Sequence, residues 1–248
     1  MKKTITWAFA TIALLTVLTG CKKDDEDKDA ISMDVVKKGV TKKPGKDGKE
    51  YDVVDLGTSV LWATCNIGAT SPQQYGYYFA WGEIGTKEDY YWHNYTLCNG
   101  EFSSIKKYIF DNDYGTVDNK EYLEPIDDAA THLMGDNWKI PSREDFVELN
   151  MRCDYKCCKL NDVWGYLFTS NETKNSIFIP LSGMRDPKEI HYSGERGYYW
   201  SNQLYKGDKD NKKTLNVYTL DLLKGDAPAD NSFQSREIGL PIRPVYTE

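Results

Sequence analysis

Ligands for transition metals are scarce in this chain of 248 residues. Its three histidines, His93, His132 and His191, are scattered, and none of its six cysteines form a C-x-x-C pair. Zinc sites are built from closely spaced cysteine and histidine ligands. The sequence therefore predicts no zinc site, and we expect no cofactor.

Positive charge is also scarce. The 31 lysines and arginines are outnumbered by 38 aspartates and glutamates, which gives a formal net charge of −7. A nucleic-acid-binding protein needs a basic surface that displaces counterions from phosphates. We therefore exclude nucleic acid as a partner.

Common catalytic motifs are missing too. The sequence has no G-x-S-x-G elbow, no phosphate-binding P-loop, no H-E-x-x-H pair and no dinucleotide fingerprint. Acidic pairs are abundant, but a sequence does not show which carboxylates lie close enough for glycoside hydrolysis. We expect a protein that is not an enzyme, and keep an extracytoplasmic enzyme acting on carbohydrate or protein as the alternative.

The only long apolar run is at residues 5–18, and no second stretch is long enough to span a bilayer. Two lysines precede the run, as in a signal peptide. It ends in Leu18-Thr19-Gly20-Cys21, which resembles the lipobox of bacterial lipoproteins. The resemblance implies a signal peptide over residues 1–20 and a lipidated Cys21, whose two or three acyl chains anchor stably where one is marginal.

A dense charged run, Lys22-Lys23-Asp24-Asp25-Glu26-Asp27, follows this cysteine. It resembles the export signal of surface lipoproteins in Bacteroides-type bacteria, which implies display on the outer face of the outer membrane. Such a run cannot be buried, so we expect residues 21–50 to form a flexible charged tether. Residues 51–248 are enough for a single domain.

Five cysteines remain after Cys21. An extracytoplasmic location permits disulfides, and an odd number leaves one thiol unpaired. Our favoured bridge is Cys65–Cys98, because each follows an aromatic-rich segment of similar character. A second bridge, from Cys153 to Cys157 or Cys158, stays open.

The domain is expected to have an α+β fold with two helices, a twisted antiparallel sheet and long irregular loops. The expected strands are Tyr51–Leu56, Val60–Cys65, Tyr75–Trp81, Gly165–Ser170, Ser176–Leu181, Tyr198–Leu204, Leu215–Leu222 and Leu240–Tyr246. Residues 82–125 are expected to be irregular. A short helix opens at Asp127-Asp128, and a second begins at Ser142, where Asp145 completes a capping box.

Two groups of residues have both a structural and a ligand-binding interpretation. Tryptophans in apolar or small-residue contexts favour core packing. These are Trp62, Trp81, Trp138 and Trp200. Asp127 and Asp128 could ligate calcium, but their place at a helix start favours capping.

Several sequence blocks occur in the order found in one family. They are Val54-Asp55-Leu56-Gly57, Val60-Leu61-Trp62-Ala63-Thr64-Cys65-Asn66-Ile67-Gly68-Ala69, Tyr75-Gly76-Tyr77-Tyr78-Phe79-Ala80-Trp81-Gly82-Glu83, Asp127-Asp128-Ala129-Ala130, Trp138-Lys139-Ile140-Pro141-Ser142, Gly197-Tyr198-Tyr199-Trp200-Ser201 and Gly239-Leu240-Pro241-Ile242-Arg243-Pro244-Val245. Together they resemble the Fibrobacter succinogenes major paralogous domain family, which is common in surface lipoproteins. That family is similar to the C-type-lectin-like fold of formylglycine-generating enzymes and of retroelement-diversified variable proteins.

The resemblance implies a ligand surface on the long loops before the final strand, here residues 184–236, held by a rigid scaffold. The candidate ligand-binding residues are Arg185, His191, Tyr192, Arg196, Asn202 and Tyr205. Formylglycine-generating enzymes hold copper with a cysteine pair late in the fold, and no cysteine follows Cys158 here. The expected function is therefore non-catalytic recognition of a glycan or protein at the cell surface. A structural or adhesive component of a surface assembly is a third hypothesis.

Overall fold

The computed structural model describes residues 27–205 and 214–248. The expected signal peptide, residues 1–20, and the expected lipidation site, Cys21, lie outside these residues. Among the described residues, no helix is long and apolar enough to cross a membrane. Helices and strands are mixed. Apart from the parallel pair β1–β7, the paired strands among the described residues are antiparallel, as expected for an α+β fold.

A five-stranded sheet has the order β2-β3-β4-β16-β6. Its strands are β2 (Val40–Pro44), β3 (Glu50–Val54), β4 (Leu61–Ala63), β16 (Val245–Tyr246) and β6 (Trp138–Lys139). The last strand of the chain therefore lies inside the sheet, between β4 and β6.

Arg243, just before β16, is fully buried and joins distant segments. Its guanidinium donates to the Asn66 side-chain oxygen at 2.8 Å, to the carbonyls of Ala63 (3.1 Å) and Phe178 (3.0 Å), and to that of Thr64. Four acceptors compensate the loss of hydration around this buried cation.

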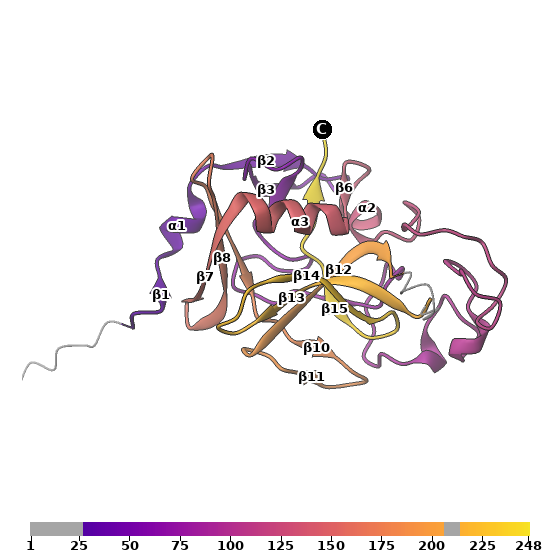
Figure 1. Ribbon diagram of the computed structural model, residues 1–248. Helices are drawn as coiled ribbons and strands as arrows, with labels where there is room; N and C mark the ends of the chain where they lie inside the picture. Colours follow the sequence, from indigo (N-terminus) through magenta and orange to yellow (C-terminus); the bar gives the residue numbers. More distant parts are fainter. Residues whose placement is uncertain (1–26, 206–213) are drawn as a thin grey trace, which may run out of the picture.

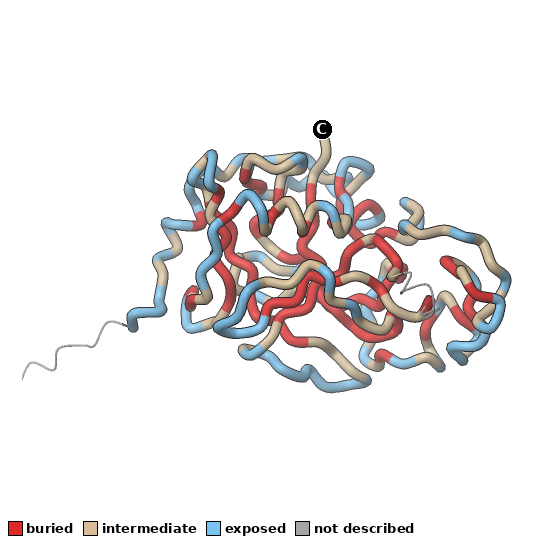
Figure 2. The backbone as a smooth tube through the Cα atoms, viewed as in Figure 1, coloured by how far each residue is buried: buried red, intermediate tan, exposed pale blue. Residues whose placement is uncertain are grey.

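A three-stranded sheet runs through the middle of the molecule in the order β12-β13-β14 (Figure 1). Its strands are β12 (Arg196–Leu204), β13 (Asn216–Leu223) and β14 (Ala229–Ser235). Side chains alternate across a strand. Tyr198 and Trp200 accordingly enter one apolar cluster while Tyr199 enters another, so this sheet is buried on both faces, as the red core in Figure 2 shows.

The helices pack on these two clusters. The short helix α2 (Ala129–Met134) contributes Ala129, Ala130 and Met134 to the first cluster. The longer helix α3 (Arg143–Arg152) lies across the β12-β13-β14 sheet and contributes Phe146 and Leu149 to the second (Figure 1). Its N-cap and capping box are the expected Ser142 and Asp145.

The four expected core tryptophans are confirmed. Trp62, Trp81, Trp138 and Trp200 are each at most 1% exposed. Every indole N–H donates a hydrogen bond: to the Thr58 hydroxyl (3.1 Å) and to the carbonyls of Ser201 (2.9 Å), Pro44 (3.0 Å) and Phe79 (2.7 Å), respectively. Because their polar atoms are satisfied, these rings can pack in the interior without an uncompensated donor.

The expectation of a flexible tether is wrong for residues 30–50. A four-stranded sheet, β1-β7-β8-β9, begins with β1 (Ala30–Ile31), and α1 (Met33–Lys37) follows it. The remaining strands are β7 (Cys153–Leu160), β8 (Val163–Ser170) and β9 (Ser176–Pro180). Val36 is buried against Leu160 and Phe178, so a few apolar residues within a charged segment cover the outer face of this sheet.

The expected disulfide is also wrong, because the described cysteines are all free. Cys98 is buried in the apolar cluster of the irregular segment, and its thiol donates to the Trp92 carbonyl. Cys65 is half-buried at the end of β4, beside the Thr64 hydroxyl. The two cysteines thus belong to different parts of the fold.

The irregular segment, residues 82–125, contains the short 3₁₀ helices η1 (Trp92–Asn94) and η2 (Phe102–Ser104) and projects to the right in Figure 1. Arg236, which precedes the C-terminal strands and is fully buried, connects this irregular segment to the core. Its Nε donates to the Tyr95 hydroxyl at 2.9 Å and its Nη2 to the Lys107 carbonyl at 3.1 Å. The guanidinium also lies 5.0 Å from the Trp81 ring centroid.

Four short strands, in two pairs, complete the fold. A hairpin is formed by β10 (Met184–Arg185) and β11 (Ile190–His191). The strand β15 (Leu240–Pro241) pairs with β5 (Tyr78–Phe79). Backbone hydrogen bonds in both directions between Arg185 and Gly239 attach the hairpin beside β15.

Candidate functional site

The structure divides the six predicted ligand-binding residues into two groups. Asn202 and Tyr205 lie at the C-terminal end of β12. Arg185, His191 and Tyr192 belong to the β10–β11 hairpin, and Arg196 begins β12 at its other end. Figure 1 shows this hairpin at the lower edge of the molecule, below the central sheet that α3 covers. The two groups therefore do not form one site.

The first group belongs to a cluster of aromatic side chains at the end of the central sheet. Tyr205 stacks on Phe233 with ring centroids 4.5 Å apart and planes at 19°. Tyr218 meets Tyr205 edge-on at 5.0 Å. The cross-strand register pairs Tyr218 directly with Phe233, which explains why these rings share one face.

A cation extends this cluster. The Arg143 guanidinium, from the first turn of α3, lies 5.1 Å from the Tyr218 centroid. Asp230 on β14 lies 3.9 Å from the same guanidinium. We call Tyr205, Tyr218, Phe233 and Arg143 together the aromatic face. Phe233 is 38% exposed, so part of this apolar surface reaches solvent.

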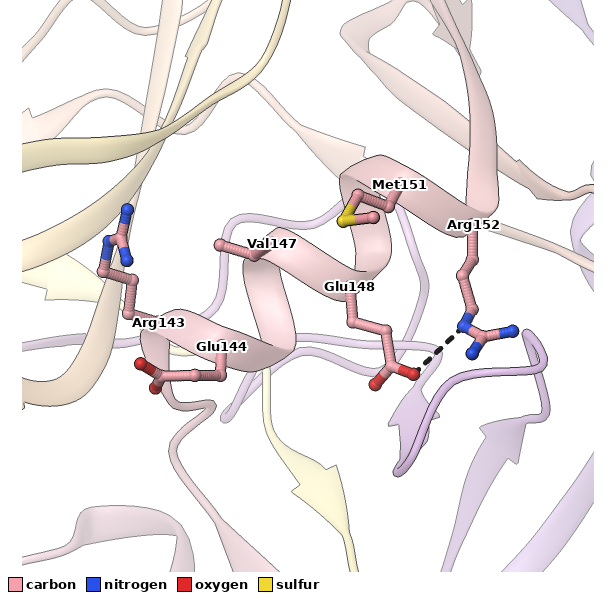
Figure 3. A pocket seen from close by; sticks show the side chains of 6 residues that line it. All are labelled: Arg143, Glu144, Val147, Glu148, Met151 and Arg152. Carbon is pink, nitrogen blue, oxygen red and sulfur yellow. Dashed lines mark hydrogen bonds and ion pairs between the residues drawn. The ribbon is translucent and has the colours of Figure 1, made fainter.

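Arg143 also borders a shallow hollow on the outer side of α3, with a volume of about 380 Å³. Its lining side chains all come from α3 and are shown in Figure 3: Arg143, Glu144, Val147, Glu148, Met151 and Arg152. Val147 and Met151 lie along one side, while Glu148 and Arg152 form an ion pair at 3.1 Å. The surface beside the aromatic face therefore combines apolar and charged groups.

Polar groups gather near the same C-terminal end of β12 that Tyr205 follows. The Gln203 amide donates to the Glu121 carboxylate at 2.9 Å and to the Tyr122 hydroxyl at 3.2 Å. The side-chain oxygen of Asn202 is buried without a hydrogen-bond partner among the described residues. Tyr122 is 46% exposed and adds a further aromatic ring with a polar end. Aromatic surface bordered by amides and carboxylates is well suited to a ligand that is both polar and rich in C–H groups.

The second group is held by the hairpin. The His191 ring is exposed, and its Nε2 lies 2.7 Å from the Asp186 carbonyl. Tyr192 is 50% exposed and has a φ of +61°, a conformation that few non-glycine residues adopt. Its carbonyl accepts a hydrogen bond from the Arg196 N–H at 2.8 Å. Arg185 lies on β10, beside a cavity that is described below.

Arg196 has a structural partner. Its guanidinium forms a hydrogen-bonded ion pair with Asp221 on β13, at 2.7 Å, and lies 5.2 Å from the Tyr198 ring. This contact with Asp221 raises the pKa of Arg196. Because its partner is a buried carboxylate of the same sheet, Arg196 joins β12 to β13.

The carboxyl groups of raised pKa also have structural roles. Burial raises the pKa of Asp128, which accepts the N–H groups of Ala130 and Thr131 as the N-cap of α2. Burial likewise raises the pKa of Asp145, in the capping box of α3, and of Glu237, which accepts a hydrogen bond from Ser235. Raised carboxyl pKa values often mark catalytic acids. Here the same groups hold helix ends and a turn.

Asp127 and Asp128 do not point at a common ligand. The Asp127 carboxylate accepts hydrogen bonds from the Lys107 ammonium at 2.7 Å and the Tyr108 hydroxyl at 2.6 Å. Asp128 is engaged by backbone N–H groups, as the capping interpretation predicts. Across residues 27–205 and 214–248, no cluster of three or more metal-ligating side chains is found.

Sequence reasoning missed three members of the aromatic face: Arg143, Tyr218 and Phe233. Phe233 is an isolated aromatic residue within the polar strand Ala229–Ser235, which the sequence analysis did not identify as a strand. An exposed aromatic between asparagine, serine and glutamine is an available signal for a surface contact. The alignment of Phe233 with Tyr218, in contrast, depends on the register of β13 and β14.

Comparison with known proteins gives no relative: no family model, curated protein or solved structure matches this chain.

Proposed function

We propose that this chain is a lipid-anchored protein of the outer bacterial surface that recognises a glycan, without catalysis, through the aromatic face. The single observation that carries this proposal is the Tyr205–Phe233 stack, partly open to solvent, with the Arg143 cation beside it. Aromatic rings pack against the C–H faces of sugars, while charged and amide groups bind the hydroxyls. Both kinds of group lie together here.

We also propose a C-type-lectin-like fold within the Fibrobacter succinogenes major paralogous domain family. The support is local. The block from Trp138 to Ser142 enters α3 through a capping box, and the block from Ile242 to Val245 leads into β16 with Arg243 buried. The lipobox ending at Cys21 supports the anchor, and the acidic run after it supports surface display.

The shape of the hollows and the roles of the buried carboxyl groups support the enzyme alternative less than they support recognition. The hollows beside the aromatic face and the hairpin are open, and the carboxyl groups of raised pKa are occupied by capping and turn interactions. An active site needs such groups to converge on one enclosed substrate position. The aromatic face instead resembles a shallow recognition surface.

The test is a glycan array probed with the mature chain, in which Cys21→Ser removes the lipid. We expect binding that Tyr205→Ala and Phe233→Ala each reduce at least about tenfold, since stacked aromatic contacts dominate such surfaces. Tyr155→Ala is the matched control, because Tyr155 is 47% exposed on β7, in a different sheet. Circular dichroism confirms that each variant is folded.

Two results would contradict the proposal. If Tyr155→Ala weakens binding as much as Phe233→Ala, the aromatic face is not the site. If the array shows no binding at all, glycan recognition is refuted, and a protein partner or a surface assembly becomes the better hypothesis. The edge of β14, which pairs with no strand other than β13 among residues 27–205 and 214–248, would then be the first surface to examine, since edge strands can pair with other chains.

A further inference from the structure

A separate cavity of about 440 Å³ lies beside the β10–β11 hairpin. Arg185 and Ile190 line it from the hairpin, and Tyr77, Tyr90 and Lys87 line it from the segments next to β5. We call it the Arg185 cavity. Its volume falls within the range of about 300–1,000 Å³ that is usual for small-molecule sites.

The floor of this cavity is rigid. The Tyr90 ring is 1% exposed, and its hydroxyl donates to the Tyr78 carbonyl and accepts the Lys87 N–H at 3.3 Å. The ring packs on Gly239, where a Cβ atom would lie only 2.9 Å from the nearest ring carbon. A glycine at this position therefore lets the ring approach the backbone pair of Gly239 and Arg185.

Arg185 lies next to this ring, with its guanidinium 5.8 Å from the Tyr90 centroid. The register pairs Arg185 with Ile190, so the two side chains share one face of the hairpin. Backbone hydrogen bonds to Gly239, at 2.8 and 2.9 Å, fix the position of Arg185. The backbone from which the Arg185 side chain extends is thus held by strand pairing and does not belong to a flexible loop.

The charge of Arg185 is unmatched. Its Nε is buried without a hydrogen-bond partner, and none of the ion pairs between described residues includes it. Lys87, the other cation of the cavity, is neutralised by Glu83 at 2.9 Å and also donates to the Asn94 carbonyl. Part of this guanidinium is therefore removed from water without compensation, which carries a free-energy cost, and an anion bound to its accessible N–H groups can offset that cost.

We infer that the Arg185 cavity binds the carboxylate of an acidic sugar. A guanidinium presents parallel N–H donors that match the two oxygens of a carboxylate. Tyr77 and Ile190, which are 55% and 45% exposed, provide apolar surface beside the cation for the C–H face of the sugar ring. Glu88 is the exposed acid of the lining, and it disfavours ligands of higher negative charge.

This site is independent of the aromatic face and does not require that face to bind anything. The two are built from different elements, the hairpin with the β5 segment in one case and α3 with β12, β13 and β14 in the other. A failure of one proposal therefore leaves the other testable on the same protein.

The experiment measures binding of glucuronate, glucose and acetate to the mature Cys21→Ser chain by isothermal titration and ligand-observed NMR. We expect glucuronate to bind at least about tenfold more tightly than either glucose or acetate, a difference of about 1.4 kcal/mol. Glucose lacks the carboxylate and acetate lacks the sugar ring, so the two comparisons separate the contribution of the carboxylate to the affinity from that of the ring. Inorganic phosphate serves as a further anion.

Four variants locate the site. Arg185→Gln removes the charge and should reduce glucuronate affinity at least about tenfold, and Arg185→Lys should retain part of it, because the cation stays while the planar fork is lost. Lys188→Gln, on the same hairpin, removes an equal charge outside the cavity and should leave the affinity unchanged. Phe233→Ala should also have no effect on glucuronate.

Each contrary result overturns the inference. Absence of glucuronate binding, equal binding of glucose, or an unaffected Arg185→Gln variant would show that Arg185 takes no carboxylate. Equal binding of acetate or tighter binding of phosphate would show that the cavity takes an anion but does not recognise a sugar. Equal losses in Arg185→Gln and Lys188→Gln would show only a general effect of charge.

Discussion

Replacing Asp128 by alanine tests the junction between α2 and β6. One oxygen of this buried carboxylate accepts the N–H groups of Ala130 at 2.8 Å and Thr131 at 3.0 Å. The other accepts the Ile140 N–H at 3.0 Å. Asp128→Ala therefore removes a helix N-cap and leaves the Ile140 donor buried without a partner.

The magnitude follows from these contacts. Loss of an N-cap costs about 1 kcal/mol, and an unpaired buried donor costs about 1–3 kcal/mol, so the free energy of unfolding should fall by about 2–4 kcal/mol. For a domain of this size, the thermal midpoint should fall by roughly 5–15 °C. Asp128→Asn should lose less, because asparagine also caps helices.

Differential scanning calorimetry provides the assay, with and without calcium. Asp136→Ala is the control, since Asp136 is exposed in the turn that follows α2 and should change stability by less than about 0.5 kcal/mol. The reasoning is refuted if Asp128→Ala is as stable as Asp136→Ala. It is equally refuted if calcium stabilises the wild type and Asp128→Ala abolishes that effect, because the carboxylate would then be a metal ligand.

Two further predictions concern titratable groups. Burial raises the pKa of Cys153 to about 12 and of Cys158 to about 11, so both thiols should react slowly with Ellman's reagent in the folded protein. The denatured Cys21→Ser chain should show five reactive thiols. A count of three would contradict this and would indicate a bridge such as Cys65–Cys98. Burial also raises the pKa of Glu237 above 4.5, so its contribution to stability is present below that value and is lost as the pH rises through the folded-state pKa. Glu237→Gln should therefore gain stability relative to wild type as the pH rises from below 4.5 through the folded-state pKa, and a difference in thermal midpoint that stays constant with pH would contradict this.

Local signals predicted part of the fold. The start of α3 was predicted because Ser142 and Asp145 are only three residues apart and satisfy each other's backbone groups. The four core tryptophans were predicted from their apolar or small-residue surroundings, and the structure buries all of them. In each case, the information lies within a short stretch of chain.

Other elements depend on distant partners. The strand Cys153–Leu160 was missed because it follows α3 directly and is exposed at three consecutive residues, 154–156, so it shows no alternation of buried and exposed side chains there. It is a strand because it pairs with β8 along its whole length. The strand Ala229–Ser235 was missed because most of its residues are polar, as is common in a strand at the edge of a sheet. The aromatic face was also only partly predictable from the sequence. Tyr205, Tyr218 and Phe233 come together through strand register, and the sequence analysis named only Tyr205 among them.

The position of β16 has a consequence for how the protein is made. This strand occupies the interior of the five-stranded sheet, where it pairs with both β4 and β6, and the Arg243 just before it donates to a carbonyl about 180 positions earlier. A chain that emerges N-terminus first, from a ribosome or through a translocation channel, cannot join β4 to β6 until β16 has emerged. The contacts that complete this sheet are therefore among the last that the described residues can form, although most of its strands are made early.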